Sequence, residues 1–401
     1  MGPGEGTDLA SVRCTSEPPT TEPTNAAMIS RQDILRLLHR PDGQLPVLSV
    51  FLDMSVNEVN QRTYRLFLDK ELARHAELDS DREGHHREAL GAAFERVRQW
   101  LEDGFDRANR GVAVYTEIGG DWLEALQFPV PVRNRVVIST CPIIGPVAQV
   151  VEQHRSYGIL VVDREHLRLI HAYLGEALSE HETTTEPYPT PHDTRAGGEE
   201  AKDRQKRKAE EVRHFFKEFA QEAVEFDRRY RPDDLVLLGT RENVTYFMEF
   251  LPQQLREKVV HTDNAPIHEP TPAILERLAP FFHAQGESRE TSTVDLLRDR
   301  YTNRHLAVAG FPDTLEQLQE GKVDTLVLAR DIERPGAHCG RCGFYLDRHD
   351  GACPYCGGKL DDSIDLVEAM IRIAEEQEVR LEFVAPEAVT DLHGVGALLK
   401  F

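Results

Sequence analysis

Four of the six cysteines lie in one short segment and have the spacing of a metal site. They follow the pattern C-x2-C-x10-C-x2-C, at Cys339, Cys342, Cys353 and Cys356. A glycine follows each pair, at Gly343 and Gly357, and allows a tight turn whose backbone N–H groups face the sulfurs. Four thiolates satisfy tetrahedral Zn²⁺, with Zn–S distances of about 2.3 Å, and leave no open position for water. The pattern predicts one structural zinc, with iron as the rival metal and a redox-active dithiol as the alternative without metal.

The remaining residues near this cluster are not expected to take part in it. His338 and His349 lie near the cysteines, and we interpret both as exposed residues that do not bind the metal. Cys14 and Cys141 are isolated from the cluster and from each other. With no secretory signal in the sequence, this use of cysteine indicates a reducing cytoplasm and a metal site, not a disulfide framework.

A second candidate site is the sequence RAGGEEAKDRQKRK, in which two glycines precede a basic run. Residues 202–217 hold seven lysines and arginines against three acids, whereas the whole chain has a formal net charge of −22. This local excess favours contact with RNA phosphates. The expected contact residues are Gly197, Gly198, Glu199, Lys202, Arg204, Lys206, Arg207 and Lys208. The alternative is a plain helix N-terminus, where Glu199 and Glu200 interact favourably with the helix dipole.

Composition limits the class of protein. A chain of 401 residues, with 40% hydrophobic and 29% charged residues, is long enough for two or three globular domains. No apolar run approaches the roughly 20 residues that a membrane span needs, and the strongly acidic balance argues against a general DNA or RNA coat. Residues 1–28 are rich in Pro, Thr, Ser and Glu, which predicts a disordered tail and not a signal peptide.

Catalytic motifs are lacking in the sequence. It contains neither a G-x-G-x-x-G motif nor a Walker-type phosphate loop, so we expect neither nucleotide binding nor nucleotide hydrolysis. His154, His166 and His171 lie in strand-like regions without a matching carboxylate, serine or cysteine spacing, and are interpreted as core or surface histidines.

Strand and helix patterns divide the chain into three α/β domains. An N-terminal α/β domain is expected at 29–150, a middle domain with helices on a mixed sheet at 151–288, and an α-β-α domain at 289–401 with the cysteine module inserted at 337–358. The segment 182–196 is polar and proline-rich, which predicts a loop that leads to the Gly-Gly pair. A helix of about 25 residues is expected to follow that pair.

The order of these features resembles a known family. The loop and basic helix RAGGEEAKDRQKRKAEEVRHFF, the segments DLVLLGTRENVTYFMEFL and LEQLQEGKVDTLVLARD, and the terminal GVGALLKF are similar to class-one peptide release factors of archaea and eukaryotes and to Pelota. The resemblance covers roughly 151–401 and favours the bacterial branch that includes the ribosome hibernation factor Balon. A zinc ribbon in the third domain is also familiar from archaeal members.

The resemblance implies a fold and a set of partners. It implies a degenerate α/β N-terminal domain, a ribonuclease-H-like middle domain and a C-terminal domain with the fold of kink-turn-binding ribosomal proteins, carrying a zinc ribbon. It also implies binding in the ribosomal A site, with contacts to rRNA and the tRNA acceptor end, and a partner such as elongation factor Tu or another translational GTPase. The stop-codon motif Asn-Ile-Lys-Ser of the eukaryotic members has no counterpart in 29–150.

One departure from the family pattern decides the functional hypothesis. Gly197 and Gly198 match the glycines of the family's Gly-Gly-Gln motif, which promotes hydrolysis of peptidyl-tRNA, but Glu199 stands where the family has glutamine. A carboxylate cannot donate the hydrogen bonds of an amide and adds negative charge where oxyanion charge develops. The expected function is therefore a cytoplasmic, non-catalytic hibernation factor. The alternative is a release or rescue factor that hydrolyses peptidyl-tRNA.

Overall fold

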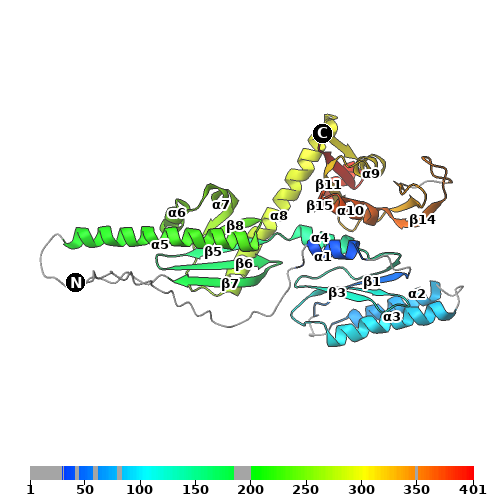
Figure 1. Cartoon of the computed structure of the whole chain (residues 1–401), viewed down its shortest axis with the longest axis horizontal. Helices are drawn as coiled ribbons and strands as arrows, with labels where there is room; N and C mark the ends of the chain where they lie inside the picture. The colour runs from blue at the N-terminus through cyan, green and yellow to red at the C-terminus, as the bar shows by residue number, and fades with distance from the viewer. Residues whose placement is uncertain are drawn as a thin grey trace, which may run out of the picture.

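A computed structural model describes residues 29, 31–40, 45–56, 62–78, 84–184, 200–347 and 351–401. These residues form three α/β units, as the sequence predicted (Figure 1). The tail expected at 1–28 lies outside the described residues, so that prediction stays open.

The N-terminal unit is an antiparallel sheet with helices on both faces. Its strands have the order β3-β2-β1-β4 and are β1 (Val47–Asp53), β2 (Gly111–Glu117), β3 (Leu123–Phe128) and β4 (Arg135–Ser139). Helices α2 (Tyr64–Leu78) and α3 (Gly84–Asp103) cover one face, where apolar side chains of alternate strand positions meet the apolar side of α3. On the opposite face, Phe51 and Tyr115 share a core with the helices α1 (Arg31–Leu38) and α4 (Gly145–Gln153).

The middle unit has the strand order β7-β6-β5-β8-β9, in which β5, β8 and β9 are parallel and β6 and β7 antiparallel. These strands are β5 (Tyr157–Val162), β6 (His166–Tyr173), β7 (Glu176–Thr184), β8 (Asp234–Gly239) and β9 (Val259–Asp263). One face carries α5 (Glu200–Tyr230), α6 (Arg241–Met248) and α7 (Gln253–Lys258). This arrangement agrees with the expected ribonuclease-H-like fold.

The expected loop at 182–196 needs correction at its start, because β7 continues to Thr184. The sequence EALSEHETT is polar, yet it pairs with β6 over its whole length after the turn at Gly175, where φ is +78°. An edge strand tolerates such a polar sequence because most of its side chains are exposed. Residues 185–196 lie outside the described part of the chain.

The C-terminal unit contains two sheets. The larger has the order β10-β16-β11-β15, from β10 (Ala307–Ala309), β11 (Val323–Ala329), β15 (Arg380–Val384) and β16 (Val395–Leu399). Helices α9 (Phe311–Gln319) and α10 (Leu366–Glu376) cover one face, and a 3-10 segment, η1 (Pro386–Leu392), lies on the other. The smaller sheet, β13-β12-β14, holds the cysteine module and consists of β12 (Pro335–Cys339), β13 (Tyr345–Leu346) and β14 (Leu360–Asp365).

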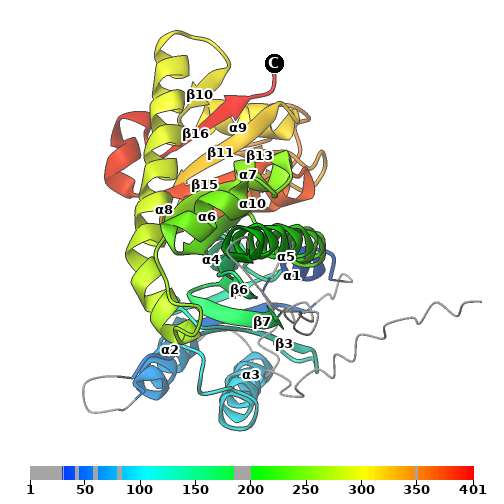
Figure 2. The same cartoon turned by 90° about the vertical axis from the view of Figure 1, so that its left-hand side faces the viewer.

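Two helices belong to more than one unit. Helix α4 precedes the middle sheet in sequence but shares one hydrophobic core with α1, the N-terminal sheet, α9 and α10 (Figure 1). Helix α8 (Thr271–Thr302) packs Ile274 and Leu278 on the middle sheet and Val294 and Leu297 on the C-terminal sheet (Figure 2). The expected boundary at 288/289 therefore falls within a continuous helix.

Candidate functional site

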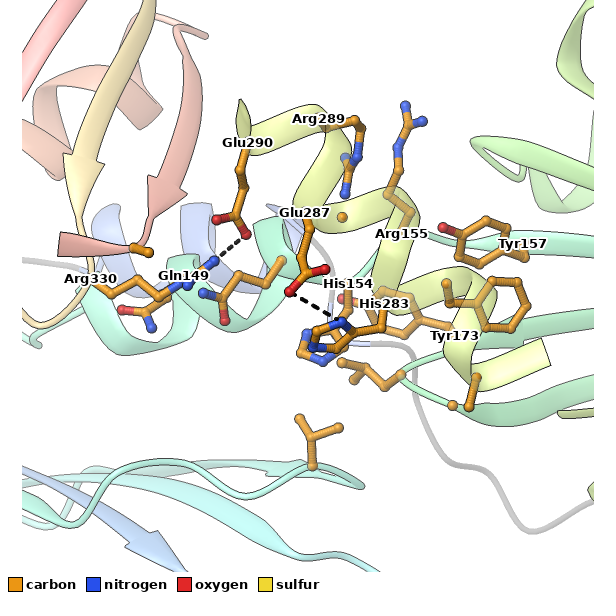
Figure 3. Close-up of a pocket in the computed structure, with 18 of the residues that line it drawn as sticks. Gln149, His154, Arg155, Tyr157, Tyr173, His283, Glu287, Arg289, Glu290 and Arg330 are labelled. Carbon is orange, nitrogen blue, oxygen red and sulfur yellow. Dashed lines mark hydrogen bonds and ion pairs between the residues drawn. The ribbon is translucent and has the colours of Figure 1, made fainter. Parts of the chain in front are cut away.

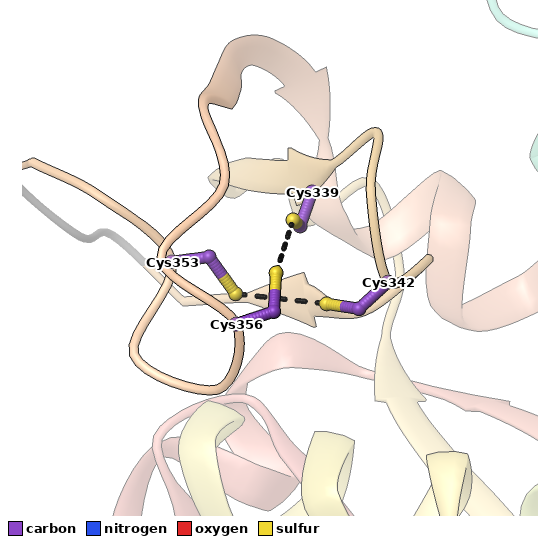
Figure 4. Close-up of side chains that lie close together, drawn as sticks. All are labelled: Cys339, Cys342, Cys353 and Cys356. Atoms are coloured by element: carbon purple, nitrogen blue, oxygen red, sulfur yellow. Dashed lines mark hydrogen bonds between the residues drawn. The ribbon is translucent and has the colours of Figure 1, made fainter.

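The four predicted cysteines come together in the small sheet (Figure 4). Their sulfurs all lie within 4.8 Å of one another, with Cys339 Sγ 3.5 Å from Cys356 Sγ and Cys342 Sγ 3.6 Å from Cys353 Sγ. Sulfurs at the corners of a tetrahedron around Zn²⁺ lie about 3.8 Å apart when each Zn–S bond is about 2.3 Å. The donor set and its spacing thus fit a four-coordinate metal ion.

Backbone turns hold the two cysteine pairs in this position. The N–H of Gly343 donates to the carbonyl of Cys339, and the N–H of Gly357 to that of Cys353, each at 2.8 Å. Both glycines have positive φ, +78° and +69°, a conformation that disfavours other residues. Hydrogen bonds from the backbone N–H groups of Cys342 and Arg341 lower the pKa of the Cys339 thiol to about 6. This turn thus favours a thiolate at Cys339, whereas burial and the neighbouring thiols raise the pKa of Cys342 to about 12.

The neighbouring histidines lie differently. The His338 ring stacks on Tyr345, with a centroid distance of 4.6 Å, and is not part of the cysteine cluster. His349 lies outside the described residues.

The structure describes little of the predicted RNA-contact loop. Gly197, Gly198 and Glu199 lie outside the described residues. Lys202, Arg204, Lys206, Arg207 and Lys208 all fall in the first turns of α5, whose backbone is described there but whose side chains are not. Figure 1 shows this end of α5 extending past the edge of the middle sheet, away from the other two units.

The opposite half of α5 is firmly packed. Phe216, Phe219 and Ala223 are buried against the sheet, as their helical spacing predicts, and Phe216 contacts the rings of Phe247 and Phe250. The N-terminal end of α5 is thereby presented on a rigid support.

The three histidines are core or surface residues as expected, but His171 and His166 each have a polar side-chain partner that the sequence did not indicate, and His154, at the end of α4, lies 2.9 Å from the carbonyl of Val150. The Nε2 atom of buried His171 lies 2.7 Å from the Ser156 hydroxyl, and His166 Nδ1 lies 3.1 Å from an Asp163 oxygen. Burial lowers the pKa of His171. The sequence does not indicate the contact of Ser156 with His171, because only the antiparallel pairing of β5 with β6 brings the two residues together.

Two carboxylates at the ends of α4, one buried and one half-buried, were not foreseen at all. Buried Glu368 of α10 accepts hydrogen bonds from the N–H groups of Ile144 and Gly145, at 2.6 and 2.9 Å, where α4 begins. At the other end, Glu152 of α4 accepts from the N–H of Phe383 at 3.2 Å. Burial raises the pKa of Glu368 to about 7 and that of Glu152 to about 8. The C-terminal unit therefore holds α4 at both of its ends.

Within the residues that the structure describes, no helix is long and apolar enough to cross a membrane.

Sequence comparisons agree with the architecture. Residues 142–282 match the model of bacterial archaeo-eukaryotic release factor family 10. Peptide chain release factor subunit 1 of Pyrococcus abyssi is 22% identical over 353 residues, which cover 77% of this chain and 83% of the relative. The protein of the same name from Methanocaldococcus jannaschii is 21% identical over 365 residues, with 79% and 84% covered.

Among solved structures, the archaeal translation termination factor aRF1 is 16% identical and aligns over 93% of this chain and 99% of its own, with a TM-score of 0.24. Dom34 of S. cerevisiae is 9% identical and aligns over 74% and 81%, with a TM-score of 0.38. Residues 142–282 thus match a bacterial release factor family, and most of the chain is similar in sequence to archaeal peptide chain release factors.

Proposed function

We propose that this protein binds the A site of idle ribosomes and occupies it without hydrolysing peptidyl-tRNA. The observation that carries the proposal is the sequence Gly197-Gly198-Glu199, at the position of the Gly-Gly-Gln motif in a chain of this superfamily. The two glycines preserve a loop that can approach the tRNA acceptor end, whereas Glu199 removes the amide donor.

The position of α5 supports this role. A helix that extends past its sheet can carry a loop and a basic surface into a narrow RNA-lined site while the rest of the domain stays outside (Figure 1). The aromatic packing around Phe216 anchors the helix against the force of such an insertion. The five basic residues between 202 and 208 would meet rRNA or tRNA phosphates.

Three further assignments belong to the proposal. Cys339, Cys342, Cys353 and Cys356 hold one structural Zn²⁺, because a closed set of four thiolates suits this ion. The C-terminal unit contacts elongation factor Tu or another translational GTPase. The protein works in the cytoplasm, where its ribosomes are.

Co-sedimentation with purified 70S ribosomes tests the binding. We expect the wild-type protein to pellet with ribosomes, and the triple variant Lys206→Glu, Arg207→Glu, Lys208→Glu to bind at least tenfold more weakly. Arg228→Glu, at the far end of the same helix, is the matched control and should bind like wild type. Absence of pelleting at low salt would rule out the proposal, and equal binding of all variants would rule out the role of the basic run.

A second function, hydrolysis of peptidyl-tRNA in release or rescue, is favoured by the retained Gly197-Gly198 pair. In that case the loop would position a water molecule through backbone N–H groups, without the glutamine. Binding assays do not separate the two functions, but a release assay does.

A further inference from the structure

A cavity of about 930 Å³ lies where the three units meet (Figure 3). Its wall is formed by the end of α4, the segment that leads into β5, the β6–β7 turn, the middle of α8, and the C-terminal unit at Arg330 and Ala385. Pockets for small organic ligands commonly measure about 300–1,000 Å³ and often lie between domains. The cavity is thus large enough for a ligand of nucleotide size.

The cavity wall is positive in a strongly acidic chain. Three arginines line it, Arg155, Arg289 and Arg330, against the two glutamates Glu287 and Glu290. Glu290 is paired with Arg330, and Glu287 lies 3.6 Å from the ring of His283 (Figure 3). Arg155 bonds Asp234 at 2.6 Å. Arg330 and Arg155 thus each have an acidic partner, and Arg289 is the arginine of the wall that is most available to an anionic ligand.

Two donors in this wall are left without an acceptor. The Nε atoms of Arg289 and Arg330 are buried and have no hydrogen-bond partner, and in the part of the chain that the structure describes no other charged side chain has such an atom. A buried donor without a partner is destabilising, and more so when it is charged. Both arginines line the same cavity, and among the described residues the guanidinium of Arg289 has no hydrogen bond or ion pair, so its terminal N–H groups can bind the acceptor oxygens of a ligand.

The protein's own carboxylates neutralise Arg289 only in part. Glu152 and Glu382 lie near its guanidinium, but burial raises the pKa of both, that of Glu152 to about 8. Glu152 therefore carries a proton at neutral pH for most of the time. A permanently charged oxyanion, such as a phosphate, would compensate Arg289 better.

The rest of the wall combines polar side chains with an apolar part. Leu174, Ala279, Phe282 and Ala388 contribute to it, and Phe282 is held in place by stacking on Tyr157 with a centroid distance of 4.0 Å. A free phosphate ion would fill only a small part of this volume and would leave the apolar part without contacts. The lining fits a ligand with an anionic end and a planar or apolar body.

We propose that the cavity binds a small organic phosphate of nucleotide size, with its phosphate on Arg289 and Arg330 and its ring against Phe282. Arg155 belongs to the middle unit, Arg289 to α8, and Arg330 to the C-terminal unit, so the ligand links the parts of the chain that meet there. Occupancy thereby stabilises one arrangement of the middle unit relative to the other two. This inference does not depend on ribosome binding.

Isothermal titration calorimetry on the full-length, metal-loaded chain without ribosomes tests the proposal. The probes are adenosine monophosphate and guanosine monophosphate, with adenosine and inorganic phosphate as partial ligands. We expect saturable binding of a monophosphate, with adenosine and inorganic phosphate each at least tenfold weaker. Arg289→Gln should weaken binding about tenfold or more, because one charge-assisted hydrogen bond is lost.

Arg300→Gln, on the same helix but outside the cavity, is the control and should bind like wild type. If Arg289→Gln does not fold, Arg330→Gln replaces it and should show a similar loss. No binding of either monophosphate would overturn the proposal, as would unchanged affinity in the arginine variant. Equal binding of inorganic phosphate and the monophosphates would contradict the role of the apolar wall and so the class of ligand.

Discussion

The cysteine module and the junction at α4 both involve the C-terminal unit, but they are held together by different chemistry. The module gathers four sulfurs from one segment, and Cys339 and Cys356 are only 17 residues apart. At the junction, Glu368 bonds the N-terminus of α4 at Ile144 and Gly145, which precede it by 224 and 223 residues in the sequence. This contact lies within a core that three units share. The first arrangement depends on thiolates and on the proposed metal ion, the second on apolar burial and on carboxylates whose pKa is raised by burial. The two should therefore respond differently to chelators, to mutation and to pH.

The largest expected effect is removal of the proposed metal. Cys339→Ser, or treatment with a chelator, should unfold the small sheet, since metal binding contributes on the order of 10 kcal/mol in small zinc domains. Hydrogen exchange of residues 335–347 and 351–365 should rise to the level of an unfolded chain, while exchange in α4 stays slow. Cys141→Ser is the control and should leave the module protected. Elemental analysis should find one zinc per wild-type chain; a chain that lacks metal under reducing conditions would disprove this part of the account.

The next effect is at the junction. Glu368→Ala removes two hydrogen bonds and leaves the N–H groups of Ile144 and Gly145 buried without an acceptor. We expect a loss of about 3 kcal/mol in the free energy of unfolding. Both tryptophans, Trp100 and Trp122, lie in the N-terminal unit, so urea unfolding followed by tryptophan fluorescence reports on its coupling to α10. Exposed Glu376→Ala on the same helix should change stability by less than about 0.5 kcal/mol. Equal midpoints for the two variants would show that the junction is not a point of attachment.

The third prediction concerns pH. Burial keeps protons on Glu152 and Glu368 in the folded chain at pH values where the unfolded chain has released them. The folded state then binds more protons, so this contribution to stability is complete below about pH 4.5 and is lost as the pH rises through 7 to 8. Glu152→Gln should reduce the loss of unfolding free energy between pH 5 and 8. The reduction should be about 1.4 kcal/mol for each unit of pKa shift that the substitution removes. Thermal melts across this range measure the slope, and identical slopes in wild type and variant would contradict the assignment.

The smallest effect is expected from the half-exposed ion pairs at the rim of the same junction. Arg135 lies 3.3 Å from Asp365 and 3.1 Å from the exposed Glu333. Because solvent screens such pairs, Arg135→Ala should cost no more than about 1 kcal/mol and should lose its effect at high salt. A cost as large as that of Glu368→Ala would mean that surface charge, and not the buried contacts, holds the units together.

What the sequence could predict follows from the range of the interactions. The cysteine spacing and the long helix after the Gly-Gly pair depend on neighbours in sequence, and both were foreseen. The three α/β units and the superfamily were also predicted, because strand and helix patterns survive even where residue identity is low.

Other features could not be predicted because they depend on contacts between distant segments. The sequence around Glu368 reads as an amphipathic helix, and nothing in it tells that this carboxylate faces the start of α4. The polar strand β7 is stable only through its pairing with β6, and Ser156 meets His171 only through the register of β5 with β6. The cavity with Arg155, Arg289 and Arg330 likewise exists only after the three units are assembled.

A peptidyl-tRNA release assay on ribosomal complexes is the most direct test of the central claim. The account predicts that the wild-type protein binds these complexes but releases no more peptide than the buffer control. Glu199→Gln, which restores the family's amide, is the informative partner variant, and any release that it gains would assign the loss to this residue. Release by the wild-type protein that Gly198→Ala abolishes would contradict the account and establish the chain as a hydrolytic release or rescue factor.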